Sequence, residues 1–195
     1  KGDYSCIVAG IDNGGSKRID EYSPWINAEY GGGEGSEYID FIVAELKPFI
    51  DQNYRTKSDP ENTAMIGSSM GGLITFYGGI KYQNVFGLLG PLSSSYWFSI
   101  FAYDFAEAYD FTDASQKIYM IAGGKEGGNQ VGDMYFMRKT LYESNFDPSL
   151  IEAIDHPNEG HNETYWAKEF PNVYKWLFNK GLNSTTEQKS NYNFI

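Results

Sequence analysis

The chain has 195 residues, and 41% of them are hydrophobic, so it is long enough to form one domain with a buried core. The net charge of -11 is spread along the chain and not gathered in a tail, which argues against nucleic acid or a membrane as a partner. A single cysteine, Cys6, excludes an internal disulfide, and with only two histidines beside it no metal site is expected.

The N-terminal segment predicts the first strand of a sheet. Residues Tyr4 to Ile11 are largely apolar, and Cys6 within this run is expected to be a buried strand residue. The chain contains no apolar run of about 20 residues and no leader-type start. Because it opens on Lys1, we expect the domain to be incomplete at its N-terminus, which leaves secreted and cytoplasmic locations open.

Strand-like apolar runs alternate with helical stretches along the rest of the chain. Apolar side chains recur on one helix face over residues 36–51, where Pro48 is expected to kink or end the helix, and a last helix is predicted over residues 164–180. Such alternation predicts an α/β fold over residues 1–182, with a mostly parallel sheet covered on both faces, and a polar C-terminal tail over residues 183–195. Further strands are expected at Thr63 to Ile66, Val85 to Leu89, Lys117 to Ala122 and Leu150 to Asp155.

The pentapeptide Gly67-Ser68-Ser69-Met70-Gly71 fits a nucleophile elbow, a sharp strand-to-helix turn that presents a serine hydroxyl to a substrate. Side chains two residues before and after that serine are expected to collide with the neighbouring backbone, and only Ser69 has glycines at both positions. The predicted strand before the motif and the apolar segment after it supply the right context. Ser69 is therefore the candidate nucleophile, and a glycine-rich turn without catalytic function is the alternative.

A serine nucleophile needs a base, and the chain offers two histidines. His161 lies in a polar loop between the last predicted strand and the last predicted helix. Loops at the carboxyl ends of parallel strands gather catalytic groups, which favours His161 as the base. His156 lies closer to the strand, where a structural or solvent-facing ring is the simpler interpretation.

The third expected member is a carboxylate that orients the imidazole and stabilises its charged form. Glu126 follows the strand predicted at Lys117 to Ala122 and gives the chain order serine, acid, histidine that is typical of α/β-hydrolases. Asp133, a few residues further on, is the alternative acid. An ordinary solvated loop carboxylate, without a catalytic role, is the other interpretation of Glu126, and its order and placement in the chain favour the acid.

Five short runs, in order along the chain, carry a resemblance to a known family. They are Ile11 to Gly15, Arg18 to Pro24, Glu45 to Asp51, Gly67 to Leu73 and Gly160 to Glu163. Together they resemble the putative esterase family, which holds esterase D, enterochelin esterases, and acetyl-xylan and feruloyl esterases. The resemblance covers most of residues 4–180 and implies an α/β-hydrolase fold, carboxylic-ester hydrolysis without a cofactor, and the roles of Ser69 as nucleophile, Glu126 as acid and His161 as base.

The oxyanion hole is the point at which the sequence departs from this family. The backbone N–H of Met70, the residue after the nucleophile, is expected to supply one donor. In the family the second donor comes from a loop upstream of the segment that resembles Tyr4 to Ile11, and the strand before that loop normally lies beside the strand that carries Ser69. We therefore expect the fold to lack its N-terminal strands, with a missing segment, a second chain or a rearranged sheet completing it.

The substrate is predicted only as a class. A serine-dependent ester hydrolase that acts through an acyl-enzyme, on acetyl or feruloyl esters of carbohydrate or related small esters, is the leading expectation. An acyltransferase of the same fold and a catalytically incomplete binding or remnant protein remain as alternatives. Substrate-binding candidates are Tyr96 and Trp97, which follow three serines after a predicted strand, and Ser68, the neighbour of the nucleophile.

Overall fold

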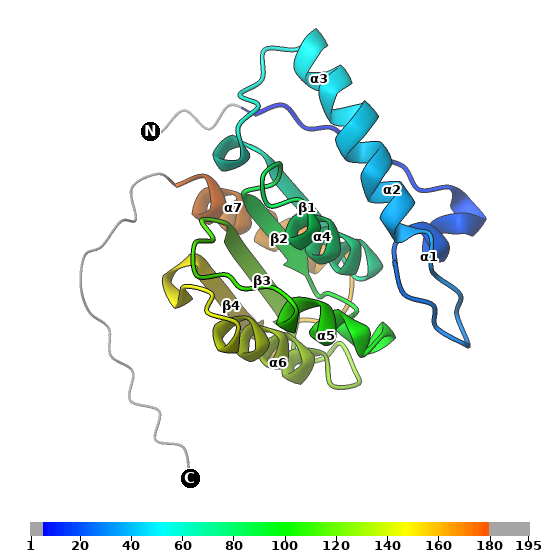
Figure 1. Cartoon of the computed structure of the whole chain (residues 1–195). Helices are drawn as coiled ribbons and strands as arrows, with labels where there is room; N and C mark the ends of the chain where they lie inside the picture. Colours follow the sequence, from blue (N-terminus) through cyan, green and yellow to red (C-terminus); the bar gives the residue numbers. More distant parts are fainter. Residues whose placement is uncertain (1–5, 180–195) are drawn as a thin grey trace.

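A computed structural model describes residues 6–179, and its centre is a four-stranded sheet (Figure 1). All neighbouring strands run parallel, and their order along the sheet is the order of the chain, β1-β2-β3-β4. The α/β fold predicted from the alternation of strand-like and helical segments is therefore confirmed. The strands are β1 Ala64–Ser68, β2 Leu88–Leu92, β3 Lys117–Gly123 and β4 Ile151–His156.

Helices cover both faces of the sheet. Figure 1 shows α4, α5 and α6 in front of the strands and α7 behind them, while α2 and α3 lie outside α4. The helices are α1 Arg18–Glu21, α2 Gly35–Phe41, α3 Lys47–Asn53, α4 Met70–Lys81, α5 Phe101–Glu107, α6 Gln130–Glu143 and α7 Glu163–Phe178.

The core divides into two apolar layers because successive side chains of a strand point to opposite faces of the sheet. On β3, Ile118 and Met120 face the layer that contains α4, α5 and α6, whereas Tyr119 and Ile121 face the layer under α7. The α7 layer is smaller, and its buried members are Leu88, Leu92, Tyr119, Ile121, Tyr165, Val173 and Leu177.

The strand predicted at the N-terminus is wrong for the part of it that the structure describes. Residues 6–11 have no regular structure, and Cys6, which was expected to be buried, is exposed. An apolar run forms a stable strand only beside a partner that takes its backbone hydrogen bonds. Within residues 6–179, β1 pairs only with β2, and no strand lies along its other side. Residues 4 and 5, and the predicted tail 183–195, lie outside the described residues.

The second predicted strand is displaced by a few residues, because Gly90 and Pro91 lie inside β2. A proline cannot donate to a sheet ladder, so Gly90-Pro91 is typical of a turn in sequence. In the structure the pairing of β2 with β3 is recorded for Leu88, Leu89 and Leu92 and skips these two residues. The other three strands predicted from Thr63 onward begin and end within two residues of their predicted limits.

The helix predicted over residues 36–51 is present, and its interruption lies just before Pro48. A wide helical turn over Ile42–Leu46 joins α2 to α3, and Pro48 sits in the first turn of α3. A proline lacks the N–H that an α-helix needs in its interior, and a wider turn accommodates that missing donor.

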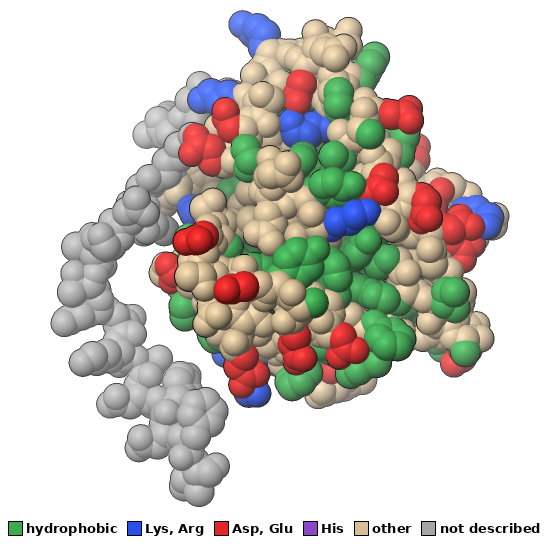
Figure 2. Space-filling model, in the orientation of Figure 1, with side chains coloured by type: hydrophobic (Ala, Val, Ile, Leu, Met, Phe, Trp, Pro, Cys, Tyr) green, Lys and Arg blue, Asp and Glu red, His purple; other side chains and the backbone are tan. Residues whose placement is uncertain are grey.

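The surface charge follows the sequence-based expectation. Acidic side chains are scattered over the face shown in Figure 2, with lysines and arginines between them. No extended basic patch appears on this face. Within residues 6–179, no helix has both the length and the hydropathy needed to cross a membrane.

Candidate active site

Ser69 occupies a strained turn between β1 and α4, as the elbow pattern predicts. Its backbone has φ 60° and ψ -125°, a conformation that costs energy for any residue other than glycine. A side chain at Gly67 would collide with the backbone of Gly71. The first glycine of the pentapeptide is therefore required by the close approach of the strand end to the first turn of the helix.

The second glycine of the motif, Gly71, is not required to avoid a collision with the backbone, contrary to the sequence-based expectation. A Cβ placed on Gly71 would meet only the ring of Tyr22, at 3.8 Å, which is an ordinary contact. A Cβ on Gly72, in contrast, would lie 2.9 Å from the carbonyl oxygen of Leu92 and 3.0 Å from the Cα of Ser94. The close packing of α4 against the end of β2 thus restricts Gly72, one residue further along.

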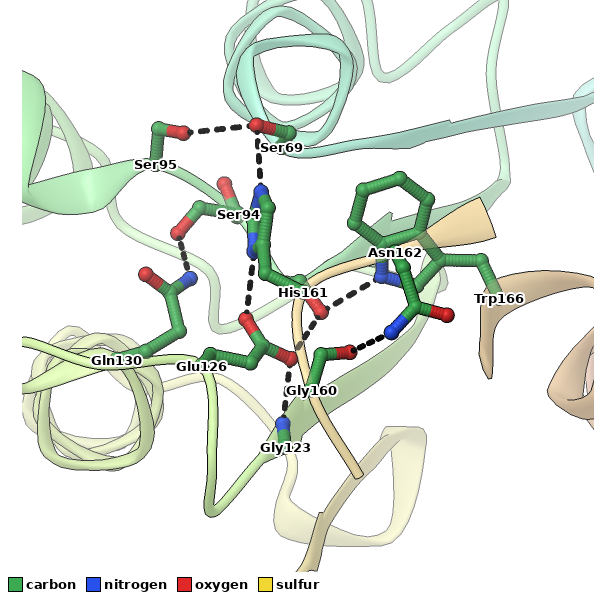
Figure 3. A network of polar contacts seen from close by, with 11 residues as sticks. Ser69, Ser94, Ser95, Gly123, Glu126, Gln130, Gly160, His161, Asn162 and Trp166 are labelled. Atoms are coloured by element: carbon green, nitrogen blue, oxygen red, sulfur yellow. Dashed lines mark hydrogen bonds and ion pairs between the residues drawn. The ribbon is translucent and has the colours of Figure 1, made fainter. Parts of the chain in front are cut away.

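His161 faces Ser69 across the carboxyl edge of the sheet (Figure 3). Its Nε2 lies 2.9 Å from the Oγ of Ser69, although 92 residues separate the two in sequence. The loop that carries His161 is held by Asn162, whose side chain accepts a hydrogen bond from the N–H of Tyr165 and donates one to the carbonyl of Gly160. Asn162 thereby caps the first turn of α7 and fixes the start of the helix next to the imidazole.

Glu126 lies on the other side of the imidazole, in the loop after β3. Its Oε2 is 2.8 Å from the Nδ1 of His161. Two backbone hydrogen bonds tie this loop to the loop after β4: the N–H of Gly124 donates to the carbonyl of His156, and the N–H of Lys125 donates to that of Glu159. The relative position of Glu126 and His161 is therefore fixed by the main chain as well as by their own contact.

The carboxylate of Glu126 is buried and fully hydrogen-bonded. Its side chain is 1% exposed, against 33% for that of His161. Oε1 accepts from the hydroxyl of Ser93 at 2.6 Å and from the N–H of Gly123 at 2.5 Å, which leaves Oε2 for the imidazole. Because an ionised carboxylate only accepts, Nδ1 of His161 carries the proton and Nε2 is free to accept one from Ser69.

Sequence reasoning missed two polar side chains that complete this network. The Oγ of Ser93, which donates to Glu126, lies 2.9 Å from the indole Nε1 of Trp166 on α7. The indole ring also packs edge-on against the ring of His161, with 4.9 Å between ring centroids. The position of Ser93 directly after a strand was a signal, but nothing in the sequence places an indole beside it.

The two alternatives left by the sequence lie apart from this site. His156 directs its Nδ1 to the hydroxyl of Tyr165, at 2.8 Å. Burial, followed by the negative charge of Glu126, raises the pKa of Tyr165, so its hydroxyl stays protonated. The other alternative, Asp133 on α6, accepts a hydrogen bond from Asn129, the residue directly before that helix, and has no recorded contact with His161.

The N–H of Met70 is available to an incoming ligand. The carbonyl of Ser69 accepts from the N–H groups of Gly72 and Leu73, and the N–H of Ser69 itself donates to Leu92. Within residues 6–179, no hydrogen bond is recorded from the N–H of Met70, which lies in the first turn of α4, where helix N–H groups have no partner in the helix. The positive end of the helix also favours an anion here.

The three predicted substrate contacts occupy different environments. Tyr96 is 1% exposed and packs edge-on against Phe76 in the core, so the structure does not favour its contact with a substrate. Trp97 is 54% exposed and contacts Tyr30 of a neighbouring loop edge to face. Ser68 is the partly buried last residue of β1. Ser95, which the sequence did not single out, places its Oγ 3.5 Å from that of Ser69.

No metal-binding arrangement is evident in the part of the chain that the structure describes. Among these residues, no three His, Cys, Asp or Glu side chains lie close enough together to hold an ion. The hydroxyl of Ser69, the imidazole of His161 and the carboxylate of Glu126 lie in line, an arrangement that can perform nucleophilic chemistry.

Comparison with protein families agrees with this geometry. The model of the family described as Putative esterase matches residues 4–177. The chain belongs to this family. The four-stranded parallel sheet and its covering helices are accordingly the α/β-hydrolase-like fold of this family, as the five sequence runs indicated.

Individual relatives of this esterase family member differ in length. Over 187 residues it is 29% identical to YbbA of Bacillus subtilis (strain 168), a match that covers 89% of this chain and 74% of YbbA. Over 57 residues it is 42% identical to an endo-1,4-beta-xylanase/feruloyl esterase of Xylanibacter ruminicola, covering 29% of this chain and 8% of that protein. The chain therefore spans most of YbbA but a small part of the second relative.

A solved structure with the same fold is that of the enterobactin esterase FES from Shigella flexneri. The two superpose with a TM-score of 0.68 at 17% sequence identity, and the match covers 86% of this chain and 42% of the FES chain. At this identity the likeness establishes the fold. More than half of the FES chain has no counterpart in this esterase family member.

Proposed function

We propose that this protein is a serine-dependent carboxylic ester hydrolase that acts through an acyl-enzyme. The observation that carries the proposal is the line of contacts from Ser69 Oγ to His161 Nε2, at 2.9 Å, and from His161 Nδ1 to Glu126 Oε2, at 2.8 Å. Each contact is within hydrogen-bonding distance, and the base is oriented by a buried acid.

The reaction follows from the direction of these hydrogen bonds. Nε2 of His161 takes the proton of the Ser69 hydroxyl while Oγ forms a bond to the carbonyl carbon of the ester. The bond from that carbon to the alcohol oxygen then breaks, and the alcohol leaves with the proton from Nε2. Water, deprotonated by the same nitrogen, attacks the acyl-enzyme and releases the carboxylic acid together with free Ser69. The charge of Glu126 stabilises the imidazolium in both halves.

The N–H of Met70 is proposed as one donor to the tetrahedral oxyanion. A single oxyanion donor is typically worth roughly 3 to 4 kcal/mol of barrier, so a second donor changes the rate strongly. Within residues 6–179, β1 has one unpaired edge beside the elbow. We propose that a strand from another segment or another chain pairs there and brings the second donor.

Hydrogen exchange tests this part of the proposal. In the isolated chain, we expect fast hydrogen exchange at the β1 amides that do not donate to β2. In a fully active protein, in which the proposed additional strand pairs with β1, the same amides should be protected. Fast exchange at these amides in a protein with full esterase activity would contradict it.

Acyl esters of carbohydrate, of the acetyl or feruloyl type, are the proposed substrates. The 57-residue similarity to a xylanase/feruloyl esterase supports this class, as does the exposed ring of Trp97 two residues after Ser95, which lies beside the nucleophile. Sugar rings and aromatic acyl groups both pack favourably on an exposed indole.

The decisive experiment is covalent labelling followed by an ester panel. A fluorophosphonate probe is expected to add one label to the wild type and none to Ser69→Ala, as measured by intact mass. Acetyl and feruloyl sugar esters should then be hydrolysed by the wild type alone. Labelling that persists in Ser69→Ala would refute the assignment of the nucleophile, and faster acyl transfer to an added sugar than to water would make the protein an acyltransferase.

A further inference from the structure

The hydroxyl of Ser93 joins the acid of the site to the helix on the other face of the sheet. Glu126 Oε1 is 2.6 Å from Ser93 Oγ, and Ser93 Oγ is 2.9 Å from the indole Nε1 of Trp166. An indole nitrogen can only donate and an ionised carboxylate can only accept. The hydroxyl therefore has one possible orientation, in which it accepts from Trp166 and donates to Glu126.

The same indole closes the arrangement into a ring. Trp166 packs against the imidazole of His161 with ring planes at 89°, while His161 Nδ1 contacts the other oxygen of Glu126 (Figure 3). Trp166 thus touches the base directly and the acid through one hydroxyl. A rotation of the Glu126 carboxylate or of the imidazole would break at least one of these contacts.

The backbone at Ser93 is kept in an unfavourable conformation. Its φ is +42°, in the left-handed region that glycine adopts more readily, and its side chain is fully buried. Its N–H donates to the carbonyl of Ile121 on β3, which fixes the residue at the carboxyl end of β2. Backbone strain of this kind clusters at functional sites, and here it accompanies a hydroxyl that only serine or a close relative supplies.

We propose that Ser93 and Trp166 are positioning residues, which hold the carboxylate of Glu126 and the ring of His161 in the orientation that activates Ser69. This inference rests on the proposed function. Because both act through the acid and the base, their loss should lower kcat and leave KM nearly unchanged, since an effect confined to the chemical step does not alter ground-state binding.

A double-mutant cycle tests the proposal. Ser93→Ala removes the hydroxyl, while the residue must still adopt the same positive φ. Trp166→Phe keeps an aromatic ring but removes the indole N–H. We expect kcat for a p-nitrophenyl ester to fall about 10- to 100-fold in Ser93→Ala and about 3- to 10-fold in Trp166→Phe. The double variant should match Ser93→Ala, because the indole N–H acts only through the hydroxyl that is already absent.

Matched variants separate positioning from stability. Ser94→Ala is the control for the serine, because no hydrogen-bond partner is recorded among residues 6–179 for the hydroxyl of this buried neighbour. Trp176→Phe, further along α7 and packed on Tyr119, is the control for the tryptophan. Both should retain kcat within about twofold. Ser93→Gly should relieve the backbone strain and be more stable than Ser93→Ala, yet have the same low kcat.

The outcomes distinguish this inference from the proposed function. A wild type that neither hydrolyses esters nor reacts with a fluorophosphonate overturns both. An active wild type in which the two losses multiply, in which KM changes instead of kcat, or in which kcat follows the stability of the Ser93 variants overturns the positioning role alone.

Discussion

Nδ1 of His161 and Oε2 of Glu126 lie 2.8 Å apart, so an acid and a base from two neighbouring strand-end loops are in direct contact. The backbone bonds from Gly124 to His156 and from Lys125 to Glu159 hold the two loops together. A pair that the main chain holds in place in this way favours catalysis, because little reorganisation is required at the moment of reaction.

The two histidines should differ sharply in their effect on activity. His161→Ala removes the group that we propose accepts the Ser69 proton, and we expect kcat to fall about 10⁴-fold. His156→Ala removes a ring that contacts Tyr165, and kcat should stay within about tenfold of the wild type. Steady-state hydrolysis of a p-nitrophenyl ester measures both. Equal losses in the two variants would contradict the assignment of the base.

The three glycines around the elbow should respond differently to a methyl group. Gly71→Ala is expected to raise the free energy of unfolding by about 0.5 kcal/mol, because its Cβ has room and alanine favours the helix. Gly72→Ala, which crowds Leu92 and Ser94, should lower it by about 1 to 3 kcal/mol. Gly67→Ala should lower it at least as much. Urea denaturation compares the three variants, and a destabilised Gly71→Ala would show that the description of the turn is wrong.

Much of this fold was readable from hydrophobic pattern, and the exceptions have local causes. The runs that became β1, β3 and β4 are strand-like in sequence and lie in the structure where they were predicted. The end of β2 was mispredicted because Pro91 is unusual inside a strand. Only the structure shows that the pairing of β2 with β3 skips this residue. Residues 6–11 were wrongly predicted as a strand, because an apolar run in the sequence does not show whether a neighbouring strand is present to pair with it.

The candidate site was partly readable for a similar reason. Ser69, Glu126 and His161 each follow a strand, and parallel strands bring their carboxyl ends to one edge. Ser93 follows the remaining strand, but its significance depends on Trp166, and the contact between them spans 73 residues. The burial of Tyr96 could not be predicted either, because exposure of adjacent aromatic residues is decided by packing against Phe76 and its neighbours.

Stability should depend on pH through Asp40, which links α2 to α4. Its Oδ1 accepts from Lys81 and from the hydroxyl of Tyr82, both at 2.6 Å. The hydrogen bond from Lys81, then that from Tyr82, lowers the pKa of Asp40, so the stability it contributes is present above its ordinary pKa and lost as pH falls through the lowered one.

Asp40→Asn tests this dependence. At pH 7 the variant should be less stable than the wild type by no more than about 1 kcal/mol, because the carboxylate is 49% exposed and partly screened. The difference should shrink below about pH 4 as the wild-type carboxyl takes up a proton. Denaturation at both pH values measures it, and an undiminished difference at low pH would contradict the electrostatic origin.

Substitutions at the adjacent residues Tyr96 and Trp97 should differ in their effect on substrate binding, because only the ring of Trp97 is exposed. Trp97→Ala removes an exposed indole, and we expect KM for feruloyl or acetyl sugar esters to rise about three- to tenfold with little loss of stability. Tyr96→Phe deletes a hydroxyl that contacts the sulfur of Met120, so KM should not change. An unchanged KM in Trp97→Ala, across a panel of acyl and sugar groups, would remove Trp97 from the substrate site.

One residue from each of the four strand ends meets at this site: Ser69 after β1, Ser93 after β2, Glu126 after β3 and His161 after β4. No subset of the sheet can assemble that constellation, because a slip or loss of any one strand displaces its member. We therefore expect Ser69 to regain its reactivity only in the last step of refolding. The rate at which a serine-directed probe labels the refolding protein would then report when the native sheet is complete.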